Sequence, residues 1–476
     1  MPNRKKTKIV ATLGPSTSTK TVLKQMLEAG ANVFRINFSH ANYDDVKKRI
    51  SMIRELNEKY GFNASILGDL QGPKLRVGVM KGEVIVSKGD KLSFCTGEEF
   101  EGTADRVYMN YDTFPRDVKA GERILLDDGK LIFEVLETNK KDEVKAKVIQ
   151  GGPLRYGKGV NLPNTNISLP ALTEKDVKDA IFACEQGVDW MALSFVRHAE
   201  DLQELQELLK KHSEHKIPII AKIEKPEGVE NIDKIVAYCD GLMVARGDLG
   251  VEIPAQEVPL IQKQLVLKAK QARIPVIIAT QMMETMITSL TPTRAEVNDV
   301  ANSVMDGADA VMLSGETSVG QYPVQVIQKM CQILKTVGSS PLIHVPEEPP
   351  HIRTKRYITK SICYHAAHMA NEIKAKAICT LTNSGYTAFQ ISAWRPSAHI
   401  LAFTSNKRIL TQLSLLWGVH AYYYDKFTST DDTVEDVNGI AKQMKYVKKS
   451  EFVINLAAMP ISDKGMVNTL RVSEIK

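Results

Sequence analysis

The chain lacks the features that mark membrane, secreted or nucleic-acid-binding proteins. Its 476 residues contain no run of 18 or more apolar residues, so the sequence predicts no membrane-spanning helix. The opening MPNRKKTKIVATLG leads directly into a short strand and has no signal-peptide core, so we expect a cytoplasmic protein. A net charge of only +6 does not indicate a nucleic-acid partner.

Disulfides, structural zinc and glycine-rich phosphate loops are not expected either. No CxxC pair occurs among the six cysteines, so we expect reduced core residues. There is no Walker motif and no GxGxxG, and a nucleotide would therefore be held by charge and metal rather than by a glycine cradle. The cysteines are Cys95, Cys184, Cys239, Cys331, Cys363 and Cys379.

Strand and helix patterns alternate regularly over the first two thirds of the chain. Eight strand patterns occur, and all but one consecutive pair are joined by a helical segment, one of them expected from Gly228 to about Tyr238. Eight βα units predict a closed parallel (βα)8 TIM barrel. The strands are expected to begin at Lys8, Asn32, Ala64, Asp189, Pro218, Gly241, Pro275 and Ala310.

Two further domains are predicted. The exceptional connection, after the third strand, reads as short strands with turns and indicates a small inserted β-barrel domain, which we expect to cover the carboxyl ends of the barrel strands as a lid. Beyond a proline-rich linker at 338–353, strands and helices alternate again and predict an open α/β domain. The expected boundaries are 1–72 and 166–340 for the barrel, 73–165 for the lid and 341–476 for a regulatory domain.

Polar residues gather where the predicted barrel strands end. Packing would place apolar residues there, and active sites of βα barrels lie at the carboxyl ends of the strands. The set is therefore interpreted as functional. Its members are Arg35, Asn37, Ser39, Asp69, Ser194, Lys222, Glu224, Asp248, Thr280, Ser314 and Glu316.

Lys222, Glu224 and Asp248 form the most informative part of this set. Lys222 and Glu224 are two residues apart at the end of one strand, and Asp248 ends the next. Two carboxylates suit a divalent cation such as Mg2+, and a lysine beside it favours a negatively charged phosphate or enolate. A surface ion pair at a strand end is the alternative for these three residues alone.

Eight segments carry a resemblance to a known family. NVFRINFSH, GDLQGPKLR, KGVNLP, AKIEKPEGV, MVARGDLGVEIP, ATQMMETM, PTRAEVNDVAN and MLSGETSVGQYP resemble the signature segments of the pyruvate kinases, in order and spacing, between residue 8 and about residue 330. The last third resembles the family's regulatory domain more loosely. The resemblance implies a glycolytic phosphotransferase, EC 2.7.1.40, that transfers the phosphoryl group of phosphoenolpyruvate to ADP, uses Mg2+ or Mn2+, and forms a homotetramer.

The same resemblance implies residue roles. Glu224 and Asp248 would hold the metal, Lys222 and Arg35 would act on the phosphoryl group, and backbone amides at Gly247 and Asp248 would bind the substrate carboxylate. Thr280, with Ser314, would serve protonation of the enolate. The expected nucleotide-binding residues are Asn37, Phe38, Ser39, His40, Arg76 and Lys158.

Lys74 departs from the pattern of the K+-requiring members of the family. Those relatives hold K+ at the positions of Asn37, Ser39, Asp69 and the Leu70 carbonyl, and they carry Glu where this chain has Lys74. We expect the Lys74 ammonium group to replace K+, so that K+ is not required. The alternative is that Lys74 points into solvent.

A loop in the last domain and two rival functions stay open. The loop has hydroxyls and free backbone amides at the start of a helix, which is the form of a phosphate pocket, and in relatives this loop binds a phosphorylated sugar. The alternative is that these groups only cap the helix. A metal-dependent barrel lyase or aldolase would also use the lysine and carboxylates but would need no lid or nucleotide site, whereas a non-catalytic regulator is disfavoured because every catalytic position is filled. The loop residues are Thr382, Asn383, Ser384, Gly385 and Thr387.

Overall fold

The computed structural model describes residues 5–163, 165–338, 340, 356–426, 429–459 and 465–476. Within them, eight parallel strands close into a barrel in the order β1-β16-β15-β14-β13-β12-β3-β2. The predicted barrel is confirmed, and each strand begins at the predicted residue or one residue later. The strands are β1 (Lys8–Thr12), β2 (Val33–Asn37), β3 (Ser65–Asp69), β12 (Trp190–Leu193), β13 (Ile219–Ile223), β14 (Gly241–Ala245), β15 (Val276–Ala279) and β16 (Ala310–Leu313).

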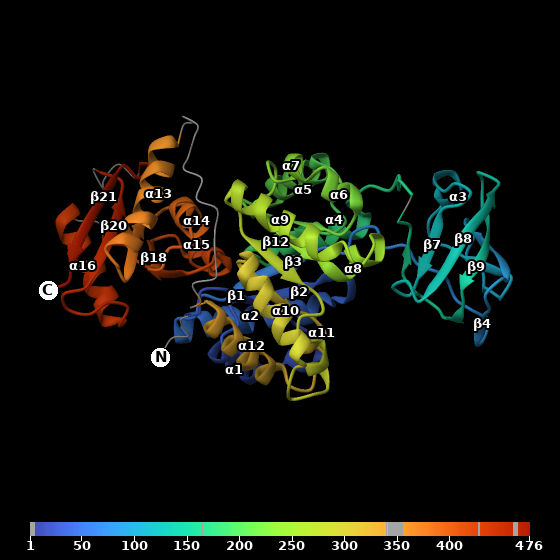
Figure 1. The fold of residues 1–476 in the computed structure, drawn as a ribbon, viewed down its shortest axis with the longest axis horizontal. Helices are drawn as coiled ribbons and strands as arrows, with labels where there is room; N and C mark the ends of the chain where they lie inside the picture. Colours follow the sequence, from blue (N-terminus) through green and yellow to red (C-terminus); the bar gives the residue numbers. More distant parts are fainter. Residues whose placement is uncertain (1–4, 164, 339, 341–355, 427–428, 460–464) are drawn as a thin grey trace.

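Helices surround this barrel in the middle of the molecule (Figure 1). Apolar side chains of strands and helices form one large core between them, and a second cluster, with Val33, Trp190 and Met243, fills the inside of the barrel. The helices are α1 (Lys20–Ala29), α2 (Tyr43–Tyr60), α4 (Glu174–Glu185), α5 (Ala199–His212), α6 (Pro226–Glu230), α7 (Ile232–Ile235), α8 (Arg246–Glu252), α9 (Val258–Ala272), α10 (Arg294–Asp306), α11 (Gly315–Ser318) and α12 (Pro323–Gly338).

The single helix expected from Gly228 to about Tyr238 is wrong, because the structure has two short helices, α6 and α7. Pro226 occupies the first turn of α6, where its fixed φ favours a helix start, so the helix begins before Gly228. At the break, the Asn231 side chain donates to the backbone carbonyls of Glu227 and Arg197. Such side-chain bonds to backbone compete with helix continuation.

The inserted domain follows β3 and ends before α4. Its strands form a six-stranded sheet, β11-β7-β8-β9-β5-β6, and a two-stranded sheet, β10-β4, around a core separate from that of the barrel. The domain lies on the opposite side of the barrel from the C-terminal domain (Figure 1). Its elements are β4 (Val84–Val86), β5 (Lys91–Cys95), β6 (Arg106–Tyr108), α3 (Phe114–Asp117), β7 (Arg123–Leu126), β8 (Leu131–Thr138), β9 (Glu143–Gln150), β10 (Gly152–Leu154) and β11 (Val160–Asn161).

The C-terminal domain is a five-stranded open sheet in the order β19-β18-β17-β20-β21. The open α/β prediction is confirmed, although the sequence reading identified neither α16 nor the antiparallel edge strand β21. The proline-rich linker lies outside the described residues except at 338 and 340. The elements are α13 (Tyr357–Glu372), β17 (Ala377–Leu381), α14 (Tyr386–Ala393), β18 (His399–Thr404), α15 (Lys407–Gln412), β19 (Val419–Tyr423), α16 (Thr430–Gln443), β20 (Phe452–Ala457) and β21 (Thr469–Glu474).

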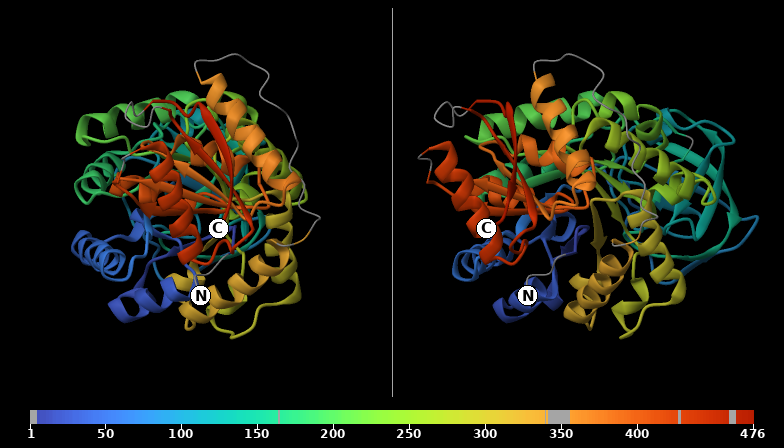
Figure 2. Two further views of the ribbon diagram at one scale, coloured as in Figure 1. Left: turned by 90° about the vertical axis from the view of Figure 1, so that its left-hand side faces the viewer. Right: turned by 60° about the vertical axis from the view of Figure 1, so that its left-hand side comes forward.

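The C-terminal domain packs against the amino-terminal ends of the barrel strands, and Figure 2 shows its sheet in front of the barrel. The indole Nε1 of Trp190 donates to the Gln412 carbonyl at 3.1 Å, and Leu415 joins the cluster inside the barrel. Arg395 forms an ion pair with Asp309 at 2.8 Å. This end of the barrel is closed by packing, so access is left to the carboxyl ends.

All six cysteines are free, and five of them are buried. The expected core position is therefore confirmed for five of the six, whereas Cys184 is only partly buried. Among the described helices, none combines the length and the apolar character needed to cross a bilayer.

Lys8 at this interface makes stability depend on pH. Its ammonium group donates to the Val419 carbonyl at 2.6 Å, and burial, with a smaller effect from Lys5, lowers its pKa to about 7. Between this value and about 10.5 the unfolded chain binds a proton that the folded chain does not, so stability rises with pH in that window. Below pH 7 both states are protonated and the full penalty of burial applies.

We therefore expect Lys8→Met to raise the thermal unfolding midpoint most near pH 6.5. The difference between the two proteins in free energy of unfolding should shrink by roughly 3 kcal/mol between pH 6.5 and 9.5, as Lys8 of the wild type loses its proton. Thermal unfolding of both proteins from pH 6.5 to 9.5 measures it. A stability difference between the two proteins that stays constant with pH would contradict the lowered pKa of Lys8.

Candidate active site

The side chains that point into the barrel change character along the strands. Val10, Val33, Leu67, Ala192, Ile220 and Met312 belong to the apolar cluster inside the barrel. Two residues further along each strand, the same face carries a polar side chain. These polar residues are Thr12, Arg35, Asp69, Ser194, Lys222 and Ser314. The strands therefore place one layer of polar groups above a dry core, at the carboxyl ends.

Lys222 lies at the centre of this layer, with 10% of its side chain exposed. Its Nζ atom donates to Ser194 Oγ at 2.6 Å and lies 3.1 Å from both Asp69 Oδ1 and Glu224 Oε1. Burial alone would lower the pKa of Lys222, but the carboxylates of Asp69 and Glu224 outweigh it and raise the pKa above its ordinary value. Lys222 therefore keeps its positive charge in a site shielded from water.

Arg35 brings a second cation to the same layer. Its Nε donates to Asp69 Oδ2 at 2.6 Å, and Nη1 donates to Thr12 Oγ1 at 3.1 Å. Burial raises the pKa of Asp69, but Lys222 and Arg35 outweigh burial and hold it below its ordinary value. Asp69 therefore stays ionised and orients two cations towards one place.

Glu224 and Asp248 are the carboxylates available to a metal. Glu224 Oε2 accepts from the Phe195 backbone amide at 2.8 Å. Burial raises the pKa of Glu224, and the negative charge of Asp248 adds to the increase. The described residues contain no group of three or more His, Cys, Asp or Glu side chains suited to one metal ion. A pair of hard oxygen donors fits a cation that keeps waters or substrate oxygens in its remaining positions.

Thr280 and Gly247 lie together at the ends of β15 and β14. The Gly247 backbone amide donates to Thr280 Oγ1 at 2.7 Å, and this hydroxyl donates to the Ala279 carbonyl at 2.5 Å. Ser314 follows β16, and its backbone amide donates to Glu316 Oε2 at 2.6 Å. The inserted domain reaches this region, because Asp128 lines a cavity of about 930 Å³ together with Gly247 and Asp248.

The expected nucleotide residues are only partly brought together. The pKa of His40 is lowered first by burial and then by the positive charges of four nearby side chains, those of Lys74, Arg76, Lys175 and Arg35. The Phe38 ring is buried in the barrel core, and its carbonyl accepts from Lys175 Nζ at 2.7 Å. Lys158 instead forms an ion pair with Asp127 of the inserted domain at 2.8 Å.

The polar groups at the positions compared above with the K+ site of relatives are engaged with neighbouring protein atoms. Asn37 Oδ1 accepts from the Ser39 amide at 3.2 Å, and the Leu70 carbonyl accepts from Ser194 Oγ at 2.7 Å. Asp69 contacts Arg35 and Lys222. Lys74 is exposed, and its charge contributes to the lowered pKa of His40.

The loop before α14 has the backbone of a tight turn. Gly385 has φ of 77°, and its amide donates to Thr382 Oγ1 at 3.0 Å. Thr387 is buried and accepts from Thr380 Oγ1 at 2.9 Å, so its hydroxyl faces the domain interior, while Asn383 and Ser384 are exposed. The guanidinium of Arg356 lies 4.2 Å from the Tyr386 ring centroid and supplies a cation near the loop.

The sequence reading missed several groups at this end of the barrel. Thr12 contacts Arg35, and Arg246 contacts the Thr280 carbonyl at 2.8 Å. Thr12 could have been found as the polar residue that ends the first strand, and Arg246 by its place immediately before Gly247. Asp299, which binds Arg246, lies within α10 and gave no such signal.

Fold and site together define a barrel enzyme with a cationic, carboxylate-bearing centre at the carboxyl ends of its strands. Comparison with known proteins identifies the family. A model of the pyruvate kinase barrel domain matches residues 4–327, and a model of the pyruvate kinase alpha/beta domain matches residues 360–473. The chain belongs to the pyruvate kinase family, whose members are phosphotransferases.

Full-length relatives support the same conclusion. The chain is 43% identical to a pyruvate kinase from Geobacillus stearothermophilus, over 99% of this chain and 81% of the relative. It is 40% identical to one from Mycobacterium tuberculosis, over 98% of each chain. A solved pyruvate kinase structure from Cryptosporidium parvum matches with a TM-score of 0.92 and 31% identity, covering 99% of this chain and 97% of the other.

Proposed function

We propose that Lys222, held between Asp69, Ser194 and Glu224, is the centre at which phosphoenolpyruvate gives its phosphoryl group to ADP. The observation that carries this assignment is a lysine, 10% exposed, with carboxylates at 3.1 Å on two sides. Negative charge develops on the transferring group and on the enolate oxygen, and a fixed cation stabilises both. ATP formation from phosphoenolpyruvate and ADP in a coupled assay tests the activity directly.

Arg35 is the second cation on the phosphoryl group in this proposal. Its bonds to Asp69 and Thr12 fix the guanidinium before substrate binds, so little conformational entropy remains to be lost. The backbone amides of Gly247 and Asp248, at the start of α8, would bind the substrate carboxylate. In the structure Thr280 Oγ1 accepts from the Gly247 amide, in the place that a carboxylate oxygen would take.

Glu224 and Asp248 would hold a Mg2+ or Mn2+ ion. Burial, and with it the negative charge of Asp248, raises the pKa of Glu224, and a bound cation would favour the ionised carboxylate. When bound, the ion neutralises charge on the substrate oxygens during transfer. Glu224 is oriented for this role by the Phe195 amide.

Thr280, with Ser314, would serve the delivery of a proton to the enolate carbon. Asn37, Phe38, Ser39, His40, Arg76 and Lys158 would bind ADP and ATP, and the cations around His40 support this. Since the Phe38 ring is buried, only its backbone is available to a nucleotide. Lys158 would have to leave Asp127 to take part.

A homotetramer in the cytoplasm is part of the same proposal. Exposed apolar side chains on α9 and α10, Leu260, Leu267 and Val297, offer a surface for a second copy. The loop from Thr382 to Thr387 would take a phosphorylated effector, with Arg356 as the nearby cation. A barrel lyase or aldolase would form no ATP, and the coupled assay separates the two functions.

We further propose that Lys74 makes K+ unnecessary. The wild type should show near-full activity in tetramethylammonium buffer with Mg2+. Lys74→Glu should lose roughly tenfold or more without K+ and recover in part when K+ is added, because ammonium and K+ are similar single charges. Many-fold stimulation of the wild type by K+ would show that the cation site is still in use.

A further inference from the structure

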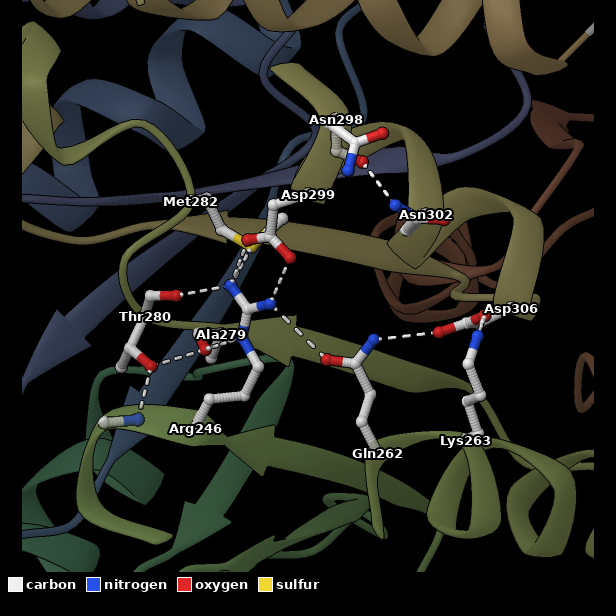
Figure 3. A network of polar contacts seen from close by, with 11 residues as sticks. Arg246, Gln262, Lys263, Ala279, Thr280, Met282, Asn298, Asp299, Asn302 and Asp306 are labelled. Carbon is white, nitrogen blue, oxygen red and sulfur yellow. Dashed lines mark hydrogen bonds and ion pairs between the residues drawn. The ribbon is translucent and has the colours of Figure 1, made fainter. Parts of the chain in front are cut away.

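Arg246 is a cation that the proposed chemistry does not use, although it immediately precedes Gly247 and Asp248 in α8. Only 13% of its side chain is exposed. Figure 3 shows its guanidinium group between the segment that follows β15 and helix α10. Nη2 donates to the Thr280 carbonyl at 2.8 Å and to Met282 Sδ at 2.9 Å, and Nε lies 3.4 Å from the Ala279 carbonyl. One side chain therefore holds the segment that carries Thr280.

Asp299 fixes this guanidinium group. Its Oδ1 accepts from Nη1 at 2.6 Å and its Oδ2 accepts from Nη2 at 2.7 Å. Such a two-point pair sets the plane of the guanidinium as well as its position, which a single contact or a lysine would not do. Asp299 lies on α10, so the pair ties the ends of two neighbouring strands to an outer helix (Figure 3).

Thr280 has a backbone conformation that needs such support. Its φ is 71°, and that of Gln281 is 53°. The left-handed region is disfavoured for a β-branched residue and persists where surrounding contacts enforce it. The same backbone angles determine the position of the Thr280 hydroxyl, which accepts a hydrogen bond from the Gly247 amide at 2.7 Å.

We propose that Arg246 and Asp299 are positioning residues, which hold Thr280 in its left-handed conformation and thereby aim its hydroxyl at the enolate carbon. They touch neither substrate nor metal in this scheme. The inference rests on the proposed function, because it takes from it the role of Thr280 in protonation. Loosening the pair should therefore slow proton delivery more than it weakens substrate binding.

Asp299→Asn, which loses the charge and one acceptor of the two-point pair, tests this against a matched control on the same helix. Asp306→Asn makes the same change seven residues on, where the carboxylate binds Lys263 and accepts from Gln262 Nε2 at 2.9 Å. Asp306 has no direct contact with Arg246 and is linked to it through Gln262, whose Oε1 lies 3.4 Å from Arg246 Nη1. Two rates are measured on each full-length protein with Mg2+: ATP formation, and exchange of the pyruvate methyl hydrogens with solvent deuterium in the presence of inorganic phosphate. Thermal unfolding confirms that each variant is folded.

We expect Asp299→Asn to lower kcat and methyl exchange by about 10- to 100-fold while KM for phosphoenolpyruvate changes less than about threefold. Arg246→Lys should behave alike, and the double variant should lose little more, since both changes break one unit. Asp306→Asn should stay within about twofold of the wild type.

Two results would overturn the inference. One is a folded Asp299→Asn protein with wild-type kcat and exchange, and the other is an equal loss in Asp306→Asn. Failure of the proposed function looks different, because the wild type would then form no ATP. If Thr280→Ala keeps full methyl exchange, the role of Thr280 is wrong and the positioning role is refuted with it.

Discussion

Replacing Lys222 by Met is expected to lower kcat by roughly three to five orders of magnitude, equivalent to about 4–7 kcal/mol of lost transition-state stabilisation. The lysine is charged, dry and already fixed by Ser194, Asp69 and Glu224, so its charge needs no reorganisation when negative charge develops on the substrate. An interaction that strengthens in the transition state lowers kcat when it is removed, whereas KM should change little.

Binding of Mg2+ or Mn2+ should survive this change. Removing a cation next to Glu224 and Asp248 leaves both oxygen donors in place and removes a repulsive charge, so metal affinity should be equal or higher. The protein should be less stable without metal, since Asp69 and Glu224 lose a partner in a buried site. Thermal unfolding with and without Mg2+ separates this effect from the loss of turnover.

Lys225 offers a matched control for Lys222. It lies three residues further on, is equally buried, and forms an ion pair with Glu252 at 2.6 Å. Lys225→Met also deletes a buried ammonium group, but its expected loss of kcat is less than about tenfold because its ion pair is with Glu252 and not with Asp69 or Glu224. Turnover of Lys222→Met within about tenfold of wild type, a loss of only ~1.4 kcal/mol, would refute the role of Lys222.

The periodicity of the strands made the centre of the site predictable. Lys222, Asp69 and Arg35 each stand two residues beyond an apolar residue that faces the barrel interior, and parallel strands bring their ends to one edge. Sequence spacing alone therefore fixes which side chains meet. It does not fix their rotamers, so the bonds from Lys222 to Ser194 and from Phe195 to Glu224 appear only in the structure.

Contacts between distant elements were beyond sequence reasoning. Arg246 and Asp299 lie 53 residues apart, and nothing in either segment marks them as partners. Lys158 was grouped with the nucleotide residues through the resemblance, whereas in the structure its ammonium group binds Asp127. At the break between α6 and α7, the Asn231 side chain donates to the carbonyl of Arg197, which lies in the loop between β12 and α5. Local propensity carries no information on such tertiary bonds.

Removal of the inserted domain is expected to abolish phosphoryl transfer to ADP while leaving the barrel folded. The Val160 amide donates to the Leu75 carbonyl at 2.9 Å, so the two ends of the domain are adjacent. Residues 76–159 can therefore be replaced by a short glycine linker. The core of the barrel contains no residue of the removed segment, and the Asn161 side chain keeps its bond to Glu252 at 2.8 Å.

The two half-reactions should respond differently to this deletion. ATP formation should fall by at least about a thousandfold, because Arg76 and Lys158 are lost and the site can no longer be closed against water. Exchange of pyruvate methyl hydrogens should persist within about tenfold of wild type, since Lys222, Glu224, Asp248 and Thr280 all belong to the barrel. Deuterium exchange followed by NMR, beside the coupled ATP assay, measures both.

An unfolded deletion protein would be recognised by thermal unfolding and by loss of the exchange reaction, and Arg76→Ala in the full-length chain then replaces it as the test. The Arg76 guanidinium donates to the Gly157 carbonyl at 2.6 Å, where the two ends of the inserted domain meet. Its positive charge also contributes to the lowered pKa of His40. Its removal should raise KM for ADP by about tenfold and leave KM for phosphoenolpyruvate nearly unchanged. Full kinase activity in a folded deletion protein would show that the inserted domain has no part in nucleotide handling. The barrel alone would then have to bind ADP through the cations that remain near His40, which are Lys74, Lys175 and Arg35.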